Sequence, residues 1–359
     1  MFSLENAVAA VMLLALIVYA LMGGADFGGG VWDLLARGPR AQAQRELIAD
    51  AIGPVWEANH VWLIIVIVLL FTGFPAAFAA IMTALNIPLS LMLIGIVLRG
   101  SAFTFRSYDL KTNQRQRQWS RLFAISSIYT PVMLGICIGA LASGRIRLVN
   151  GLPEGGFLVP WVQPFPFAIG ALTLALFAFL AAVYLTVEAQ DQELREDFRL
   201  RAWISAVLVG ALAWVCFFLA RTEASTIWVG LATRSWSLLF HIATGVAAIA
   251  AILALRFRRY YLARAAAVLQ AGLILLGWGV SQYPFLVVPD ITVAQAAAPR
   301  ITLALLLIAL GAGSLLLFPS LYFLLRIFKG PSAFAIVESA KEARASPGHR
   351  GEQPPASTQ

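Results

Sequence analysis

Two short segments place carboxylates within a chain that is otherwise strongly apolar. Asp26 lies in the segment 23–33 among five glycines, and Glu57 lies in the segment 53–62, directly after a tryptophan. A carboxyl group can take up and release protons, and its surroundings set its charge state: burial favours the neutral form, whereas a nearby arginine favours the charged form. These residue types predict proton transfer as the chemistry of the two segments.

The composition places these acids in a membrane protein. Hydrophobic residues make up 60% of the 359 residues and charged residues only 12%, with a mean hydropathy of +0.82, whereas a soluble domain carries about 25% charged residues. The formal net charge of +8 does not indicate a nucleic-acid partner, because the basic residues are spread over short loops instead of forming one patch. An ionisable group within such a chain is costly and marks a functional site.

Nine apolar runs are long enough to cross about 30 Å of hydrocarbon, which takes about 20 helical residues. The sequence therefore predicts an all-α bundle of nine transmembrane helices in one domain, residues 1–329, without an internal repeat of fixed period. The polar, proline-rich residues 330–359 are expected to form a disordered tail. The predicted spans lie near residues 5–25, 59–81, 84–104, 120–143, 165–187, 202–221, 236–256, 262–283 and 302–327.

Basic residues near the helix ends predict the orientation of the bundle. Thirteen lysines and arginines lie in the loops after the first, third, fifth and seventh spans, against four in the other loops. Because such residues collect on the cytoplasmic side, we expect the N-terminus outside and the C-terminus in the cytoplasm. Asp26 and Glu57 would then lie beside the cytoplasmic ends of the first two spans.

Arg99 is a third ionisable group that the helices can bring to the same place. It lies about fifteen residues into the third span, which also runs inward, so a rise of about 1.5 Å per residue puts it about 22 Å from the outer end. We expect Asp26, Glu57 and Arg99 to meet in the inner leaflet, where the arginine sets the charge state of the acids. A structural ion pair that only holds helices together is the alternative.

Other residue patterns give weaker or negative signals. The glycines of segment 23–33 allow close backbone approach, and a positive φ where the first helix is expected to end. They do not form a nucleotide-binding loop, because the Walker lysine and the GxGxxG spacing are missing. Cys137 and Cys216 are expected to be packing residues, and the tryptophans near helix ends, Trp32 and Trp161 among them, to be interfacial anchors.

The histidines are too few for a bundle that binds several haems, each of which needs axial ligands. Only His60 and His241 fall in predicted helices, while His349 lies in the tail. We therefore expect no metal or haem site within this chain alone. His60 either joins the polar group around Glu57 or is a hydrogen-bonded core residue, and Trp56 and Asn59 are expected to have charge-tuning or structural roles.

Several motifs together resemble subunit II of the cytochrome bd-type quinol oxidases. The likeness extends over about residues 3–329, and Gly23, which stands where the family pattern Asp-Gly-Phe-Asp has its first acid, resembles the cyanide-insensitive branch. Asp26 matches the second acid, and Glu57 matches the acid of a Trp-Asp-Gly-Asn motif. Beyond the segments 23–33 and 53–62, the matching motifs are VLRGSAF at 97–103, ASGR at 142–145, WGVSQYP at 278–284 and AAP at 297–299.

The resemblance implies a haem-free subunit of a quinol:oxygen oxidoreductase in the bacterial cytoplasmic membrane. It implies a partner subunit I that carries b-type haems, with or without a d-type haem, and the quinol site. A small accessory membrane subunit is a further candidate partner, a quinone or lipid is a further candidate ligand, and quinol and oxygen are substrates of the complex. This chain would stabilise subunit I and contribute to proton and oxygen access, with Glu57 and Asp26 as proton-pathway candidates.

Two other functions fit the same composition. A proton-coupled secondary transporter would use the acids to move a solute, but the odd number of spans, the lack of visible paired halves and the position of the acids near one face count against it. A scaffold without relay function would use the same residues only as helix contacts. Solute uptake by the chain alone would favour the transporter, and unchanged turnover after neutralising both acids would favour the scaffold.

Overall fold

The computed structural model describes residues 3–108, 113–149 and 152–329, without the side chains of 53–57, 106–108, 113–117, 148, 152–153 and 324–329. The predicted tail, 330–359, lies outside the described residues. The chain divides into two compact units, residues 1–307 and 308–359, and the fold below is that of the first unit.

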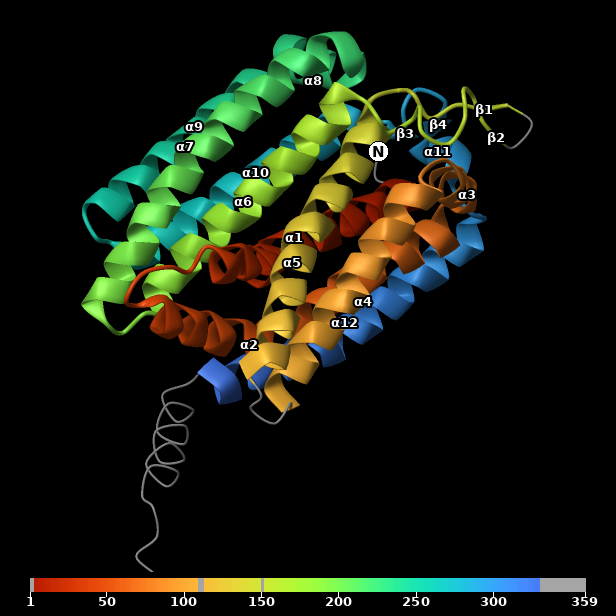
Figure 1. The fold of residues 1–359 in the computed structure, drawn as a ribbon. Helices are drawn as coiled ribbons and strands as arrows, with labels where there is room; N and C mark the ends of the chain where they lie inside the picture. Colours follow the sequence, from red (N-terminus) through yellow and green to blue (C-terminus); the bar gives the residue numbers. More distant parts are fainter. Residues whose placement is uncertain (1–2, 109–112, 150–151, 330–359) are drawn as a thin grey trace, which may run out of the picture. The chain divides into compact units, whose positions relative to one another are not determined.

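Long helices make up most of the described chain (Figure 1). The helices are α1 (Leu4–Leu34), α2 (Ala41–Gly73), α3 (Pro75–Ala84), α4 (Asn86–Tyr108), α5 (Asn113–Ala142), α6 (Pro164–Glu188), α7 (Gln192–Glu223), α8 (Ser225–Thr233), α9 (Ser237–Arg256), α10 (Tyr260–Gln282), α11 (Val293–Ala296) and α12 (Arg300–Lys329). Two antiparallel hairpins, β1 (Leu148–Val149) with β2 (Leu152–Pro153) and β3 (Phe285–Val287) with β4 (Ile291–Thr292), follow α5 and α10.

The predicted membrane spans agree with the helices, with one change in the second span. Among the described residues, eight helices are long and apolar enough to cross a membrane, and a bent helix pair can count as a ninth span. The predicted span 59–81 is a bent pair of helices, because α2 ends at Gly73 and the chain turns by 117° into α3. Phe74 takes a non-helical conformation before Pro75, as expected for a residue whose helical form clashes with a following proline.

The order of elements repeats, which the sequence does not reveal. Helix α7 breaks at Ala224, whose φ and ψ of −143° and 61° nearly equal the −138° and 61° of Phe74. The first half, α1 to α5 followed by β1 and β2, therefore corresponds in order to the second half, α6 to α10 followed by β3 and β4. The expectation that paired halves are missing is thus wrong; the repeat is one of backbone geometry.

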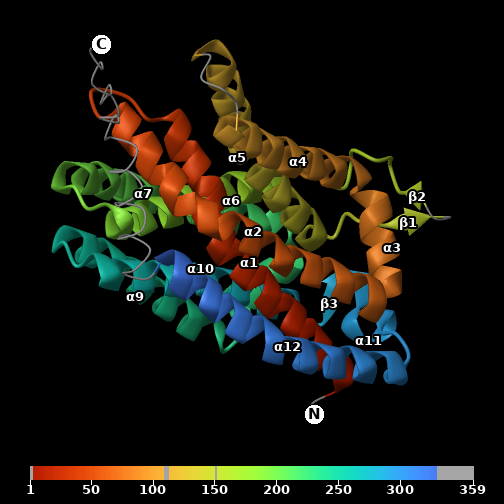
Figure 2. The ribbon, with the colours of Figure 1, turned by 90° about the horizontal axis from the view of Figure 1, so that it is seen from below.

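Backbone hydrogen bonds tie the segment after α10 to the ends of other helices. Figure 2 shows α3 running across the direction of α2 near α11 and β3. The Val288 amide donates to the Leu141 carbonyl, and the Ala298 amide donates to the Gly73 carbonyl at 2.8 Å. These bonds satisfy backbone groups at helix ends that would otherwise lack partners.

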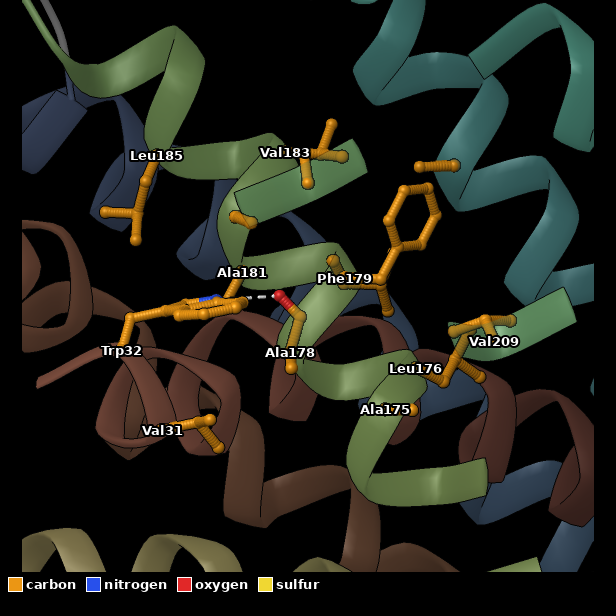
Figure 3. Close-up of a cluster of buried hydrophobic side chains, with 14 of the residues drawn as sticks. Val31, Trp32, Ala175, Leu176, Ala178, Phe179, Ala181, Val183, Leu185 and Val209 are labelled. Atoms are coloured by element: carbon orange, nitrogen blue, oxygen red, sulfur yellow. Dashed lines mark hydrogen bonds between the residues drawn. The ribbon is translucent and has the colours of Figure 1, made fainter. Parts of the chain in front are cut away.

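The core of the unit lies around α1 and α6, which contact each other and several neighbours. Helix α1 packs against α2, α5, α6 and α10. Figure 3 shows Trp32 beside Ala178 and Ala181 of α6, whereas Leu176 and Phe179 of the same helix face Val209 of α7. Trp32 donates from its indole nitrogen to the Ala178 carbonyl at 2.8 Å and is only 7% exposed. The prediction of an interfacial anchor is therefore wrong for Trp32.

Candidate functional site

Asp26 lies inside helix α1, not beside its end. The predicted span stopped at residue 25, but α1 continues to Leu34, more than two turns beyond Asp26. Among the described residues, no glycine of segment 23–33 has a positive φ. The glycines instead allow close packing, because a Cβ at Gly28 would collide with the Phe177 carbonyl and a Cβ at Gly30 would collide with the Ser127 side chain. Segment 23–33 is thus the contact surface of α1 with α5 and α6.

Asp26 and Arg99 form a buried ion pair between α1 and α4. The Arg99 Nη2 donates to Asp26 Oδ1 at 2.6 Å and to the Asp26 main-chain carbonyl at 2.9 Å. The side chains of Arg99 and Asp26 are 1% and 0% exposed. A buried arginine that lost this partner would be costly, so the two residues stabilise each other in the interior.

Side chains from α1 and α5 hold the Arg99 guanidinium in place. Its Nε donates to Ser127 Oγ at 2.9 Å, and Ser127 Oγ donates to the Phe123 carbonyl at 2.7 Å. The guanidinium carbon lies 4.8 Å from the ring centroid of Phe27 and 4.7 Å from that of Phe123, distances at which a cation is attracted to a ring face. Arg99 is therefore fixed by contacts that do not depend on the charge of Asp26.

Glu57 lies in the middle of α2, and its side chain and that of Trp56 are outside the described part of the structure. The expectation that Glu57 lies beside a helix end is wrong, since α2 begins sixteen residues earlier, at Ala41. The neighbouring Asn59 is fully buried, and a Cβ built on Gly23 would lie 3.3 Å from its Nδ2. Segment 53–62 thus runs alongside the α1 segment that carries Asp26. That the Glu57 carboxylate meets Asp26 and Arg99 stays a prediction. His60, the next residue, is half-buried.

Several polar atoms of this region have no hydrogen-bond partner among the described residues. They are Asp26 Oδ2, Arg99 Nη1, both side-chain polar atoms of Asn59 and the Tyr19 hydroxyl. Buried polar groups are nearly always hydrogen-bonded in native proteins. The polar centre, defined here as Tyr19, Asp26, Asn59, Arg99 and Ser127, therefore has unused capacity to bind or transfer protons and polar molecules.

A second polar network joins the start of α2 to the start of α7. Arg40 donates to both carboxylate oxygens of Asp197, at 2.9 and 2.7 Å, and to Glu193 at 2.9 Å. Gln44 donates to Asp197 at 2.8 Å and accepts from Arg201 at 2.6 Å. The Arg40 side chain is 41% exposed. The hydrogen bond that it donates to the Asp197 carboxylate raises the pKa of Arg40 further above the usual arginine value. This network is a link between the two halves.

The histidines offer no evident ligand set within the described residues. His241 is exposed on α9, its Nδ1 lies 2.7 Å from the Ser237 carbonyl, and its ring contacts Phe217. No group of three His, Cys, Asp or Glu side chains gathers there to hold a metal ion. Cys137 and Cys216 are separate, buried free thiols, as predicted.

Sequence reasoning missed Tyr19 and Ser127 as members of the polar centre. Single Tyr and Ser residues inside apolar runs give no signal of their own. Tyr19 comes two helical turns before Asp26, and Ser127 comes 28 residues after Arg99 in another helix. Helical periodicity relates Tyr19 to Asp26, but only the packing of α5 on α4 relates Ser127 to Arg99.

Comparison with known families gives a match over nearly the whole chain. The sequence model of the family "Cytochrome bd terminal oxidase subunit II" matches residues 4–328. A Bacillus subtilis (strain 168) protein assigned by its name to subunit II of a cytochrome bd menaquinol oxidase is 23% identical over 321 residues, which cover 87% of this chain and 91% of that protein.

Two further similarities concern a relative and a solved structure. Subunit 2 of the cytochrome bd-I ubiquinol oxidase of Escherichia coli (strain K12) is 26% identical over 208 residues, covering 57% of this chain and 53% of that protein. A chain of the bd oxidase structure from Geobacillus thermodenitrificans superposes with a TM-score of 0.72 at 22% identity, covering 91% of this chain and 99% of that chain. The structural likeness shows the fold.

Proposed function

Because the chain belongs to the family of cytochrome bd terminal oxidase subunit II, and so to a quinol oxidase complex with a partner subunit I, we propose that its polar centre helps to supply protons for oxygen reduction. Asp26 and Glu57 are the proton-carrying groups of this proposal, and Arg99 sets the charge state of Asp26. Reduction of oxygen to water consumes protons, so a route from the cytoplasm through membrane-buried acids is required.

The observation that carries the proposal is the incomplete hydrogen bonding of the Asp26–Arg99 pair. Asp26 Oδ1 accepts from Arg99, whereas Oδ2 has no partner in the described part of the chain and is the atom that can take a proton. When Asp26 becomes neutral, Arg99 keeps its bonds to the Asp26 main-chain carbonyl and to Ser127. The arginine can therefore stay in position while the carboxyl group cycles between its two protonation states.

The haem and quinol chemistry belongs, in this proposal, to the partner subunit I. The donor set of this chain supports that division, because His241 is exposed with one ring nitrogen engaged, and His60 is the other histidine of the described helices. We propose that the chain stabilises subunit I and contributes to oxygen access. It does so in a bacterial cytoplasmic membrane, with its N-terminus outside and the tail 330–359 in the cytoplasm. A d-type haem, a small accessory subunit and a bound quinone or lipid are further parts of the proposal.

Membership of the oxidase family argues against the secondary transporter. The paired halves that a transporter would need are present in the fold, but the matches to oxidase subunits extend over both halves. The scaffold function stays open as an outcome of the following experiment.

The test is turnover of the purified heterodimer with Glu57→Gln or Asp26→Asn. Each change removes a proton carrier and keeps the size of the side chain, so we expect quinol-driven oxygen consumption to fall by about a hundredfold, the usual loss for a general acid or base. Haem content, read from the reduced-minus-oxidised spectrum, should stay at the native value in Glu57→Gln. It should fall in Asp26→Asn, which leaves the buried Arg99 without its charged partner, so turnover is compared per assembled haem.

A matched control is Glu154→Gln, which removes an exposed carboxylate of the loop between α5 and α6. This variant should turn over at the native rate. Full activity in both Glu57→Gln and Asp26→Asn would contradict the relay and leave the scaffold function.

A further inference from the structure

Five polar atoms around the ion pair are buried without a partner in the described protein. They belong to Tyr19, Asn59, Asp26 and Arg99, whose residues are at most 1% exposed. An unsatisfied buried polar atom costs about 1–3 kcal/mol, so five of them would cost about 5–15 kcal/mol, the whole stability of a typical domain. Such a cost indicates partners beyond the described side chains and backbone.

These atoms lie along one face of α1. Tyr19, Gly23 and Asp26 are spaced four and three residues apart, so their positions are neighbours on the helix surface. Asn59 of α2 packs on Gly23 and so lies between Tyr19 and Asp26. Tyr19 packs in the same buried cluster as Phe27, whose ring centroid lies 4.8 Å from the guanidinium carbon of Arg99.

We propose that these groups bind a file of ordered water molecules that runs from Asp26 and Arg99, past the Asn59 amide, to the Tyr19 hydroxyl. A buried water typically makes about three hydrogen bonds to otherwise unsatisfied polar groups. The Asn59 amide offers both donors and an acceptor, and a phenol can donate and accept, so each can bond water on either side. Arg99 Nη1 can only donate, which orients the water next to it.

This inference rests on the proposed function, because it identifies water as the proton carrier at the same site. A proton moves along the file by hopping: each water accepts a proton on one side and releases another on the other side. Asp26 Oδ2 is the terminal acceptor or donor, so one proton enters for each that leaves and no other bond changes. The file extends the polar centre from Asp26 toward the N-terminal end of α1.

Gly23 makes room for Asn59, and this contact yields a sharp test. A Cβ at Gly23 would lie 3.3 Å from Asn59 Nδ2 and 3.6 Å from Phe177 and Phe27, so a Cβ fits there once Asn59 is shortened. The amide can therefore be supplied from either helix. Asn59→Ala should remove the middle of the file, and Gly23→Asn combined with Asn59→Ala should restore it.

The experiment is X-ray radiolytic labelling of the purified heterodimer, with oxidised residues identified by mass spectrometry. Hydroxyl radicals made from a bound water oxidise the side chain next to it, so a fully buried tyrosine is labelled only if water lies beside it. We expect labelling of Tyr19 in the native complex, its loss in Asn59→Ala, and its recovery in the double variant. Tyr184, whose hydroxyl bonds to the Leu21 carbonyl, is the internal control and should be labelled equally in all three proteins.

The outcomes separate the water file from the relay. Absence of Tyr19 labelling in the native complex would overturn the water file, and needs no variant that might misfold; the relay would stand if Asp26→Asn still slowed turnover. Tyr19 labelling that depends on Asn59, together with full turnover of Asp26→Asn, would support the water site and contradict the relay. Labelling of Tyr19 that is unchanged in Asn59→Ala would also overturn the file as drawn.

Discussion

The two halves of the first unit repeat one order of helices but bury different chemistry. Fifteen residues before the helix break, the first half has the buried Asn59 and the second half has the buried Val209. Arg99 is buried in α4, whereas α9 has no Asp, Glu, Lys or Arg before Arg256 at its end. Helix α6 has no ionisable residue before Glu188 at its end, whereas α1 carries Asp26 in its interior. Val209 belongs to the apolar cluster around Phe179 that Figure 3 shows.

The difference between the two halves shows that this arrangement of helices does not require a buried ion pair. The second half reaches its packing with apolar side chains, and a buried pair is often no more stabilising than apolar residues of similar volume. The first half nevertheless keeps Asp26 and Arg99 in the interior. The polar centre is therefore best explained by function, and the following predictions test that explanation.

The largest effect is expected when one member of the buried pair is removed. Arg99→Leu leaves Asp26 uncompensated among apolar residues, which should cost about 3–5 kcal/mol of unfolding free energy. The amount of assembled, haem-containing complex in detergent should fall sharply. A native yield would show that Asp26 is readily neutral in the interior.

Replacing both members should restore stability but not activity. Asp26→Leu with Arg99→Met makes the first half apolar, like the second, and such replacements are often neutral or stabilising by about 1–4 kcal/mol. We expect near-native assembly and thermal stability, with strongly reduced oxygen consumption. Native turnover in the double variant would mean that the buried pair has no part in catalysis.

Closer helix packing in the first half can be tested at its glycines. Gly28→Ala forces a Cβ against the Phe177 backbone, and such overpacking costs about 1–3 kcal/mol. Gly210→Ala in α7 is the matched control, because nothing lies within 4 Å of its Cβ; there alanine should stabilise the helix by up to about 1 kcal/mol. Thermal unfolding of both variants measures the contrast, and equal melting temperatures would contradict it.

The smallest effect is expected at the exposed link between the halves. Arg40→Ala removes the bonds to Asp197 and Glu193, but an exposed ion pair contributes only about 0.2–1 kcal/mol. The loss of stability should shrink as salt is added, because the Debye length falls from about 10 Å at 0.1 M to about 3 Å at 1 M. Melting temperatures at the two salt concentrations measure this dependence. A loss as large as that of Arg99→Leu would show that the link between the halves contributes as much stability as the buried pair inside the first half.

The sequence by itself determined the class of protein, the number of membrane spans and the two residues of the candidate ion pair. Apolar runs of about 20 residues can do little else than cross a membrane, so the helices follow from composition and length. The rarity of charges inside these runs was enough to single out Asp26, Glu57 and Arg99, because an ionisable group in hydrocarbon is costly. The motifs of segments 23–33 and 53–62 were enough to indicate the family.

Only the tertiary structure decided where these groups lie and what surrounds them. Helix α1 continues past Asp26 because its glycines are held by α5 and α6, whereas glycines in isolation favour the end of a helix. The repeat of halves appears in the breaks at Phe74 and Ala224, since backbone conformation can repeat without the residues that adopt it. The unpaired atoms of Tyr19 and Asn59 became visible only once α1 and α2 were packed, because hydrogen-bond partners are set by distance in space and not by spacing along the chain.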